Sequence, residues 1–340
     1  MDDSLLPAEE SGNTEDLMAK KRSLQGFPVA FFSIVMGLTG VVLSLQWLER
    51  LLGKPQIISS YLLFGVMVLF FFISITYARK VIKYFPDVLA EINHPVSLSF
   101  FSAITVSMLL ISIALLSVNE TASKWFWLVG TVSHFIVTMV ILSIWIQQDK
   151  FEIKHYHPGW FIPIVGTILV PVAGVHHFSV EISWFFFSIG IFFWLPMFAI
   201  FLYRVVFHPP LPQKILPTFF ILIPPPAIGF VSYINLTNGM DNFARLLYDF
   251  ALFMTIFLFT QIKLFYKIKF SLSWWAYTFP IAAISVATGM MYLLTDVLLY
   301  KIIFIGLFCL LLVVVLIVSV YTIKAMKKGD ICNNSLQGQE

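Results

Sequence analysis

The chain has 340 residues, of which 59% are hydrophobic and only 11% are charged, against roughly a quarter in a typical soluble domain. This composition excludes an ordinary soluble fold, because so much apolar surface requires lipid as its solvent. The formal net charge of +3 is too small to indicate a nucleic-acid partner, and the two cysteines, Cys309 and Cys332, provide no disulfide framework.

The two ends of the chain are predicted to be polar tails. Residues 1–25 contain six acidic residues, then Lys20, Lys21 and Arg22, and no apolar core of a signal peptide. We expect a disordered cytoplasmic tail at 1–25, a transmembrane domain at 26–324 and a cytoplasmic C-terminal tail at 325–340. Short tails of this kind favour a bacterial inner-membrane protein.

Ten segments are apolar enough to span a membrane, which takes about 20 residues of helix. In chain order they are 27–48, 58–78, 97–117, 125–147, 160–178, 183–203, 215–234, 244–265, 273–294 and 300–322. The positions of lysine and arginine support this number. With ten spans, 16 of the 21 basic residues fall on the side that holds both termini and 5 on the other side. The positive-inside rule then places both termini in the cytoplasm.

Proline marks alternate spans. The odd-numbered spans contain or begin with it, often after an aromatic residue or histidine, as in Phe27-Pro28, His94-Pro95, His157-Pro158 and Phe279-Pro280. Of the even-numbered spans only the sixth contains proline, Pro196. This alternation predicts five repeated helical hairpins, with the odd, kinked helices in an inner ring and the even helices facing lipid.

The predicted spans contain very few ionisable groups. His134 is expected to be a hydrogen-bonded packing residue, and Asp249 to pair with Arg245 four residues earlier. The histidines at 155, 157, 176 and 177 lack a third ligand, so we expect no metal and no cofactor. No cluster of nucleophile and base indicates an enzyme. Inner helices that start on the cytoplasmic side would present partial positive charge there, which favours an anion pathway.

The ninth span carries a recognisable motif. Ser273-Trp274-Trp275-Ala276-Tyr277-Thr278-Phe279-Pro280, with Ser285-Val286-Ala287-Thr288 after it, resembles the tellurite-resistance/dicarboxylate transporter family, which includes bacterial TehA proteins and the slow-type anion channels of plant guard cells. Phe27-Pro28 with Gly37, His94-Pro95-Val96 and His157-Pro158 are similar to the family pattern.

This resemblance implies an all-α polytopic membrane protein of ten transmembrane helices, arranged as five helical hairpins around a central pore, in a homotrimer with one pore per protomer. It places the family's gating phenylalanine at Phe279. The pore-lining residues that we predict lie on inner helices: Ser33, Gly37, Ser97, Phe100, Thr167, Phe220, Pro280 and Ser285.

Two functions are compatible with this sequence. The first is a passive channel in the cell membrane for small inorganic anions such as chloride and nitrate. The second is a carrier that exports C4-dicarboxylates or tellurite-type oxyanions, with or without proton coupling. A carrier for dianions is expected to keep a charged group in its passage, and the sequence offers no clear one.

Overall fold

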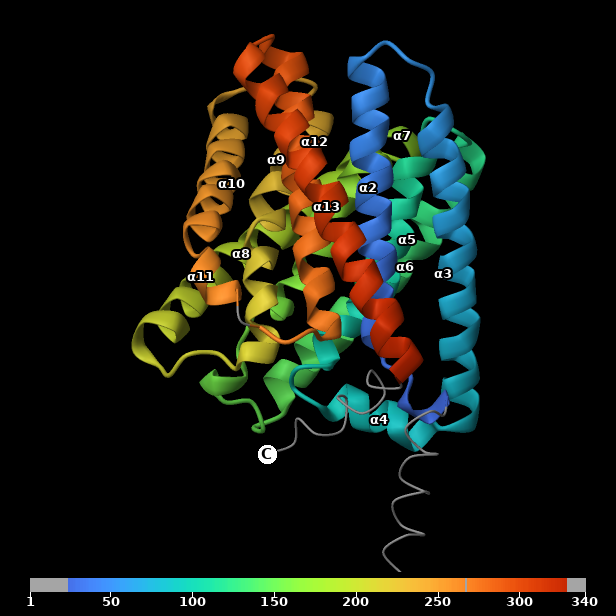
Figure 1. Ribbon diagram of the computed structural model, residues 1–340, viewed down its shortest axis with the longest axis vertical. Helices are drawn as coiled ribbons and strands as arrows, with labels where there is room; N and C mark the ends of the chain where they lie inside the picture. The colour runs from blue at the N-terminus through green and yellow to red at the C-terminus, as the bar shows by residue number, and fades with distance from the viewer. Residues whose placement is uncertain (1–23, 267, 329–340) are drawn as a thin grey trace, which may run out of the picture.

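The computed structural model describes residues 24–266 and 268–328 of the chain (Figure 1). Within these residues ten helices are long and apolar enough to cross a membrane, and each overlaps one predicted span. The prediction of an all-α polytopic membrane protein is therefore confirmed. Most of both predicted tails, with Cys332, lies outside the described residues.

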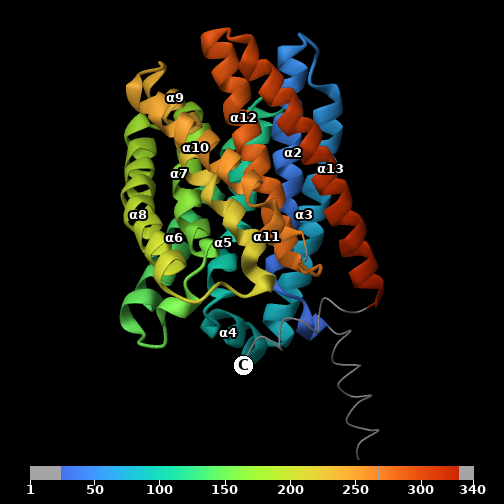
Figure 2. The same ribbon diagram turned by 60° about the vertical axis from the view of Figure 1, so that its left-hand side comes forward.

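The ten long helices form five antiparallel hairpins. The first members are α2 (Phe32–Leu51), α5 (Ser102–Leu115), α7 (Ile162–His177), α9 (Pro224–Thr237) and α12 (Thr278–Thr295). Their partners are α3 (Ile57–Lys83), α6 (Glu120–Gln147), α8 (Val180–Phe207), α10 (Asn242–Thr260) and α13 (Leu298–Lys328). The five turns lie at one end of the bundle, the hairpin end. The described part of the chain begins and ends at the opposite end, the terminal end (Figures 1 and 2).

The first helices of the hairpins form an inner ring and their partners an outer one. In the most apolar window of each inner span, 67 to 94% of the residues are buried, against 28 to 39% in the outer spans. The inner ring closes, because α2 packs against α5, α5 against α7, α7 against α9, α9 against α12, and α12 against α2. The outer helices expose large apolar side chains such as Tyr61, Phe72 and Phe192, as lipid-facing helices do.

Each inner span begins with a tight 3-10 segment at the terminal end. These segments are η2 (Val29–Phe31), η3 (Leu98–Phe101), η5 (Pro158–Phe161), η6 (Gln213–Leu222) and η7 (Leu272–Tyr277). Proline is tolerated in a first turn because the amide hydrogen that it lacks would have no partner within the helix. His94 and His157 also help to start their spans, because their side chains bond backbone amides there. The Nδ1 of His157 accepts from the Gly159 amide at 3.1 Å, and that of His94 accepts from the Val96 amide at 3.3 Å.

A short helix, α4 (Phe85–Asn93), lies across the terminal end (Figure 1). A buried ion pair anchors it, with 2.5 Å between Lys80 Nζ on α3 and Glu91 Oε1 on α4. The same Nζ donates to the Phe27 carbonyl at 2.8 Å, and the Tyr77 hydroxyl donates to Glu91 at 2.7 Å. The start of the first inner span is thereby fixed to the first outer helix.

Two smaller predictions have different outcomes. His134 is fully buried, with its ring nitrogens 2.7 Å from the Thr105 hydroxyl and 2.8 Å from the Pro163 carbonyl, so its packing role is confirmed. The predicted pair between Arg245 and Asp249 is wrong, because ion pairs in the described chain join only Lys80 to Glu91 and Lys154 to Glu152. Both residues are exposed, where such a pair gains little.

Candidate functional site

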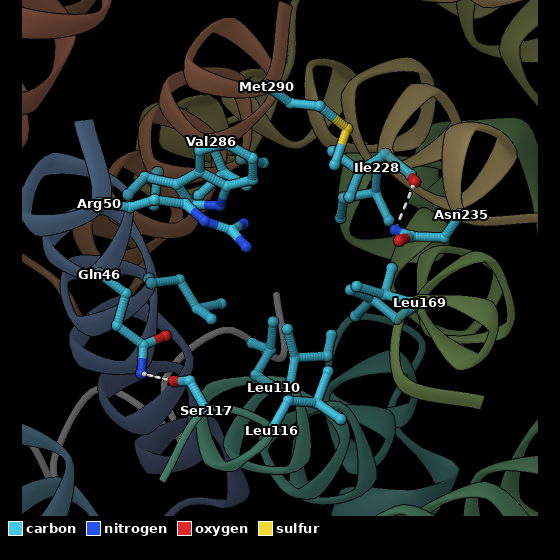
Figure 3. Close-up of a pocket in the computed structure, with 18 of the residues that line it drawn as sticks. Gln46, Arg50, Leu110, Leu116, Ser117, Leu169, Ile228, Asn235, Val286 and Met290 are labelled. Atoms are coloured by element: carbon cyan, nitrogen blue, oxygen red, sulfur yellow. Dashed lines mark hydrogen bonds between the residues drawn. The ribbon is translucent and has the colours of Figure 1, made fainter. Parts of the chain in front are cut away.

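A cavity of about 400 Å³ opens along the axis at the hairpin end. All five inner helices line it, with Leu43 on α2, Leu110 on α5, Leu169 on α7, Ile228 on α9 and Val286 on α12 among the apolar residues. Figure 3 shows side chains from the ring of helices converging on an open centre. Because the ring closes within one chain, this cavity belongs wholly to one chain.

A second, much smaller cavity lies nearer the terminal end. Its volume is about 30 Å³, which is about the space of one water molecule. Residues from all five inner spans line it: Ser33, Met36, Phe100, Ala103, Val106, Ile162, Val165, Ile221, Pro224, Leu272, Ser273, Trp275, Ala276, Phe279 and Pro280. Most of these side chains are apolar, so the space does not favour a hydrated ion.

Phe279 is the one described residue that lines both cavities. It lies in the first turn of α12, and its side chain is only 7% exposed. The two cavities are therefore separated at the height of this ring.

The position of Phe279 depends on close packing between α2 and α12. A β-carbon added at Gly37 would lie 2.1 Å from the Thr278 hydroxyl, and one added at Gly40 would lie 2.6 Å from the β-carbon of Ala282. Small residues allow such close approach of membrane helices. On the other side, the Trp275 indole donates to the Thr322 hydroxyl of α13 at 3.0 Å. The turn that carries Phe279 is thus held from two directions.

The electrostatics of the path are one-sided. No carboxylate lines either cavity among the described residues, whereas Arg50 and His176 line the larger one. Figure 3 shows the Arg50 side chain directed toward the open centre. The carboxylate of the adjacent Glu49 accepts hydrogen bonds from the Ile58 amide at 3.0 Å and from the Ser59 hydroxyl. Glu49 thereby caps the start of α3. The fixed charge that faces the path is therefore positive.

The predicted pore-lining residues fall into two groups. Ser33, Phe100 and Pro280 line the smaller cavity together with Phe279. The rest lie outside both linings: Gly37 packs against α12, Thr167 faces Gly190 of α8, Phe220 stacks edge-on against Tyr277, Ser97 lies beside His94, and Ser285 is fully buried. Four of the five lie in spans of the inner ring and Ser97 directly precedes one, and Gly37 and Thr167 face neighbouring helices.

Several polar residues of the larger cavity were not predicted. Gln46, Arg50, Ser117, His176 and Asn235 all lie in or just after the last turn or two of an inner helix. A sequence signal for Gln46 and Arg50 does exist, because they stand four residues apart and thus on one face of α2. Nothing in the sequence indicates that this face is the one turned to the axis.

Several known proteins are similar to this chain in sequence. A family model described as "SLAC1: Voltage-dependent anion channel" matches residues 26–323. An uncharacterized transporter of Methanocaldococcus jannaschii is 30% identical over 92% of this chain and 98% of its own length. The guard cell S-type anion channel SLAC1 of Arabidopsis thaliana is 26% identical over 82% of this chain and 53% of its own length. A tellurite resistance protein TehA homolog of Haemophilus influenzae is 23% identical over 76% of this chain and 79% of its own length.

Proposed function

The chain belongs to the SLAC1 family of voltage-dependent anion channels, and from this premise we propose that it is a passive channel for small monovalent anions, gated by the ring of Phe279. Transport of anions across a membrane is the general activity that the family supports. Chloride and nitrate are the anions we propose, because a narrow apolar passage such as the one beside Phe279 selects by the cost of dehydration.

The observation that carries the gate is the place of Phe279 between the two axial cavities. A large apolar ring in a narrow passage blocks ions sterically and by excluding water. Rotation of the side chain to another rotamer would join the two cavities without moving a helix. The small volume on the terminal side, about 30 Å³, supports a closed state of the proposed channel.

A passive mechanism is favoured over a carrier by the chemistry of the path. Proton-coupled carriers use ionisable groups inside the membrane. The described residues that line the cavities include no carboxylate, and their ionisable groups, Arg50 and His176, lie near the hairpin ends of α2 and α7. The alternative remains a carrier for C4-dicarboxylates or tellurite-type oxyanions. The similarity to a tellurite resistance protein TehA homolog supports this alternative.

Assembly and orientation form part of the same proposal. We propose a homotrimer in the cell membrane with one pore per protomer. One pore per protomer is supported by the single chain that closes the inner ring around the path. The terminal end would face the cytoplasm. That orientation follows from the lysines and arginines in the final turns of α3, α8 and α13, all at this end.

Planar-bilayer recording of the purified protein tests the proposal. Phe279→Ala is expected to raise anion conductance at least tenfold, because it removes the ring that separates the cavities. Phe230→Ala is the matched control, since Phe230 is fully buried on α9 and packs against Tyr248 rather than the axis. Uptake of a C4-dicarboxylate or tellurite that saturates and stops when the proton gradient collapses would favour the carrier instead.

A further inference from the structure

The hairpin-end cavity changes in polarity with depth. Its deep wall is apolar, from residues such as Leu43, Leu110 and Ile228. Its rim is polar, because Gln46, Ser117, His176 and Asn235 lie near the ends of their helices together with Arg50. Figure 3 shows both kinds of side chain around one opening. An ion that enters from this end meets polar groups first and the apolar floor at Phe279 last.

The two amide side chains of the rim already donate hydrogen bonds. The Gln46 amide nitrogen donates to the Ala114 carbonyl at 2.7 Å, and the Asn235 amide nitrogen donates to the Val231 carbonyl at 2.8 Å. The guanidinium of Arg50 has no ion pair within 4.0 Å in the described chain and lies 5.5 Å from the centre of the Trp47 ring. The hydrogen-bond donors and the positive charge of Arg50 are therefore available to a ligand.

Glu49, the acid next to Arg50 in sequence, does not pair with the Arg50 guanidinium. It is buried and bonded to the start of α3 at Ile58 and Ser59. A helix turns about 100° per residue, so the two side chains leave α2 in different directions. The acid completes the hairpin turn, and the base faces the cavity.

We propose that Arg50 binds one small monovalent anion at the rim of the hairpin-end cavity, above Trp47 and before the closed floor at Phe279. The direction of transport rests on the proposed function, but the binding itself does not. A single guanidinium with no carboxylate beside it matches one negative charge. Its planar fork of donors suits an oxyanion such as nitrate as well as a halide.

Iodide is the probe for this site, because it is a small monovalent anion that quenches tryptophan fluorescence on contact. The full chain is used in detergent, and the contribution of Trp47 is the difference between each protein and its Trp47→Phe counterpart. Arg50→Gln is expected to lower iodide quenching of Trp47 about threefold at low ionic strength, since one charge about 5.5 Å away concentrates the anion by that factor. Quenching by neutral acrylamide should stay unchanged.

Two variants complete the test. Arg50→Lys should retain most of the iodide effect, because it keeps the charge. Arg245→Gln removes an exposed arginine at the hairpin end of the outer helix α10. This variant should leave iodide quenching of Trp47 at the wild-type level. Equal iodide quenching in Arg50→Gln and Arg245→Gln would overturn the site.

Conductance separates this inference from the proposed function. In a Phe279→Ala background, Arg50→Gln should reduce anion current driven from the hairpin end more than current driven from the terminal end. Absence of current in Phe279→Ala with Arg50-dependent quenching would refute the gate and keep the site. If Phe279→Ala conducts but Arg50→Gln does not change iodide quenching of Trp47, the anion site is refuted and the gate is kept.

Discussion

Gly40 of α2 lies so close to Ala282 of α12 that a β-carbon added to the glycine would be 2.6 Å from that of the alanine. Phe279 stands one turn away, with its Cα 3.9 Å from the same added atom. The contact that brings two inner helices together is thus also the contact beside the ring that closes the path.

Gly40→Ala is therefore expected to destabilise the protein, although alanine is the better helix former. The overpacked contact should cost about 1–3 kcal/mol, against about 1 kcal/mol gained in helix propensity. Gly65→Ala is the matched control, because nothing lies within 4 Å of a β-carbon added there on the outer helix α3. Thermal unfolding in detergent should rank Gly40→Ala below the wild type and Gly65→Ala at or above it; the reverse order would contradict the close contact.

Phe279→Ala should cost less stability than Phe230→Ala. Replacing a packed phenylalanine by alanine typically costs about 3–5 kcal/mol, and the cost grows with the cavity that is left. Phe279 already borders empty space on two sides, whereas Phe230 is fully buried. The melting temperatures of the two purified variants measure the difference. Equal losses would mean that Phe279 is an ordinary packing residue.

The ion pair between Lys80 and Glu91 should matter for folding more than its position at the membrane edge suggests. The lysine side chain is 2% exposed, so Glu91→Gln leaves a charge without its partner and should cost about 3–5 kcal/mol. Glu152→Gln breaks the pair with Lys154, in which the lysine side chain is 64% and the glutamate side chain 61% exposed, and should leave stability almost unchanged. Denaturation midpoints that fail to separate these variants would contradict the anchoring of α4.

His157 is expected to make stability depend on pH. Burial, with the nearby charge of His94, lowers the pKa of His157 to about 3. The unfolded chain takes up this proton near pH 6.5, so the stabilisation is complete above that pH and is lost as the pH falls toward 3. Between pH 7.5 and 5.0 the loss should be about 2 kcal/mol, from 1.36 kcal/mol per pH unit below 6.5.

His157→Gln should remove that part of the dependence, and His155→Gln, two residues earlier, should preserve it. Thermal unfolding at the two pH values measures both. A His157→Gln protein that loses as much stability on acidification as the wild type would exclude His157 as the source.

The proposed orientation can be tested with two cysteine variants in a protein from which Cys309 and Cys332 have been removed. Lys54→Cys lies in the exposed hairpin-end turn, and Lys154→Cys in the exposed loop at the terminal end. An impermeant maleimide applied to intact cells should label position 54 and not position 154. The opposite pattern would place the terminal end outside.

The sequence predicted the number of helices, their pairing into hairpins and the inner and outer rings. These follow from apolar length and from proline at the start of alternate spans, which are local properties of the chain. The side chains that border the axial cavities do not follow from these local properties. Ser33 and Phe100 line a cavity, while Thr167 faces Gly190 of α8 and Ser285 is buried outside both linings.

The physical reason lies in the inner helices themselves. The sequence determined that they are buried, because backbone groups freed by proline and side-chain hydroxyl groups need hydrogen-bond partners that lipid cannot provide. A helix that is buried on all sides has no polar face to reveal its rotation, so only the packed ring decided which side chains reach the axis. The contact of Gly40 with Ala282 sets the height and angle of Phe279, and the engagement of Glu49 with α3 leaves the charge of Arg50 to the cavity.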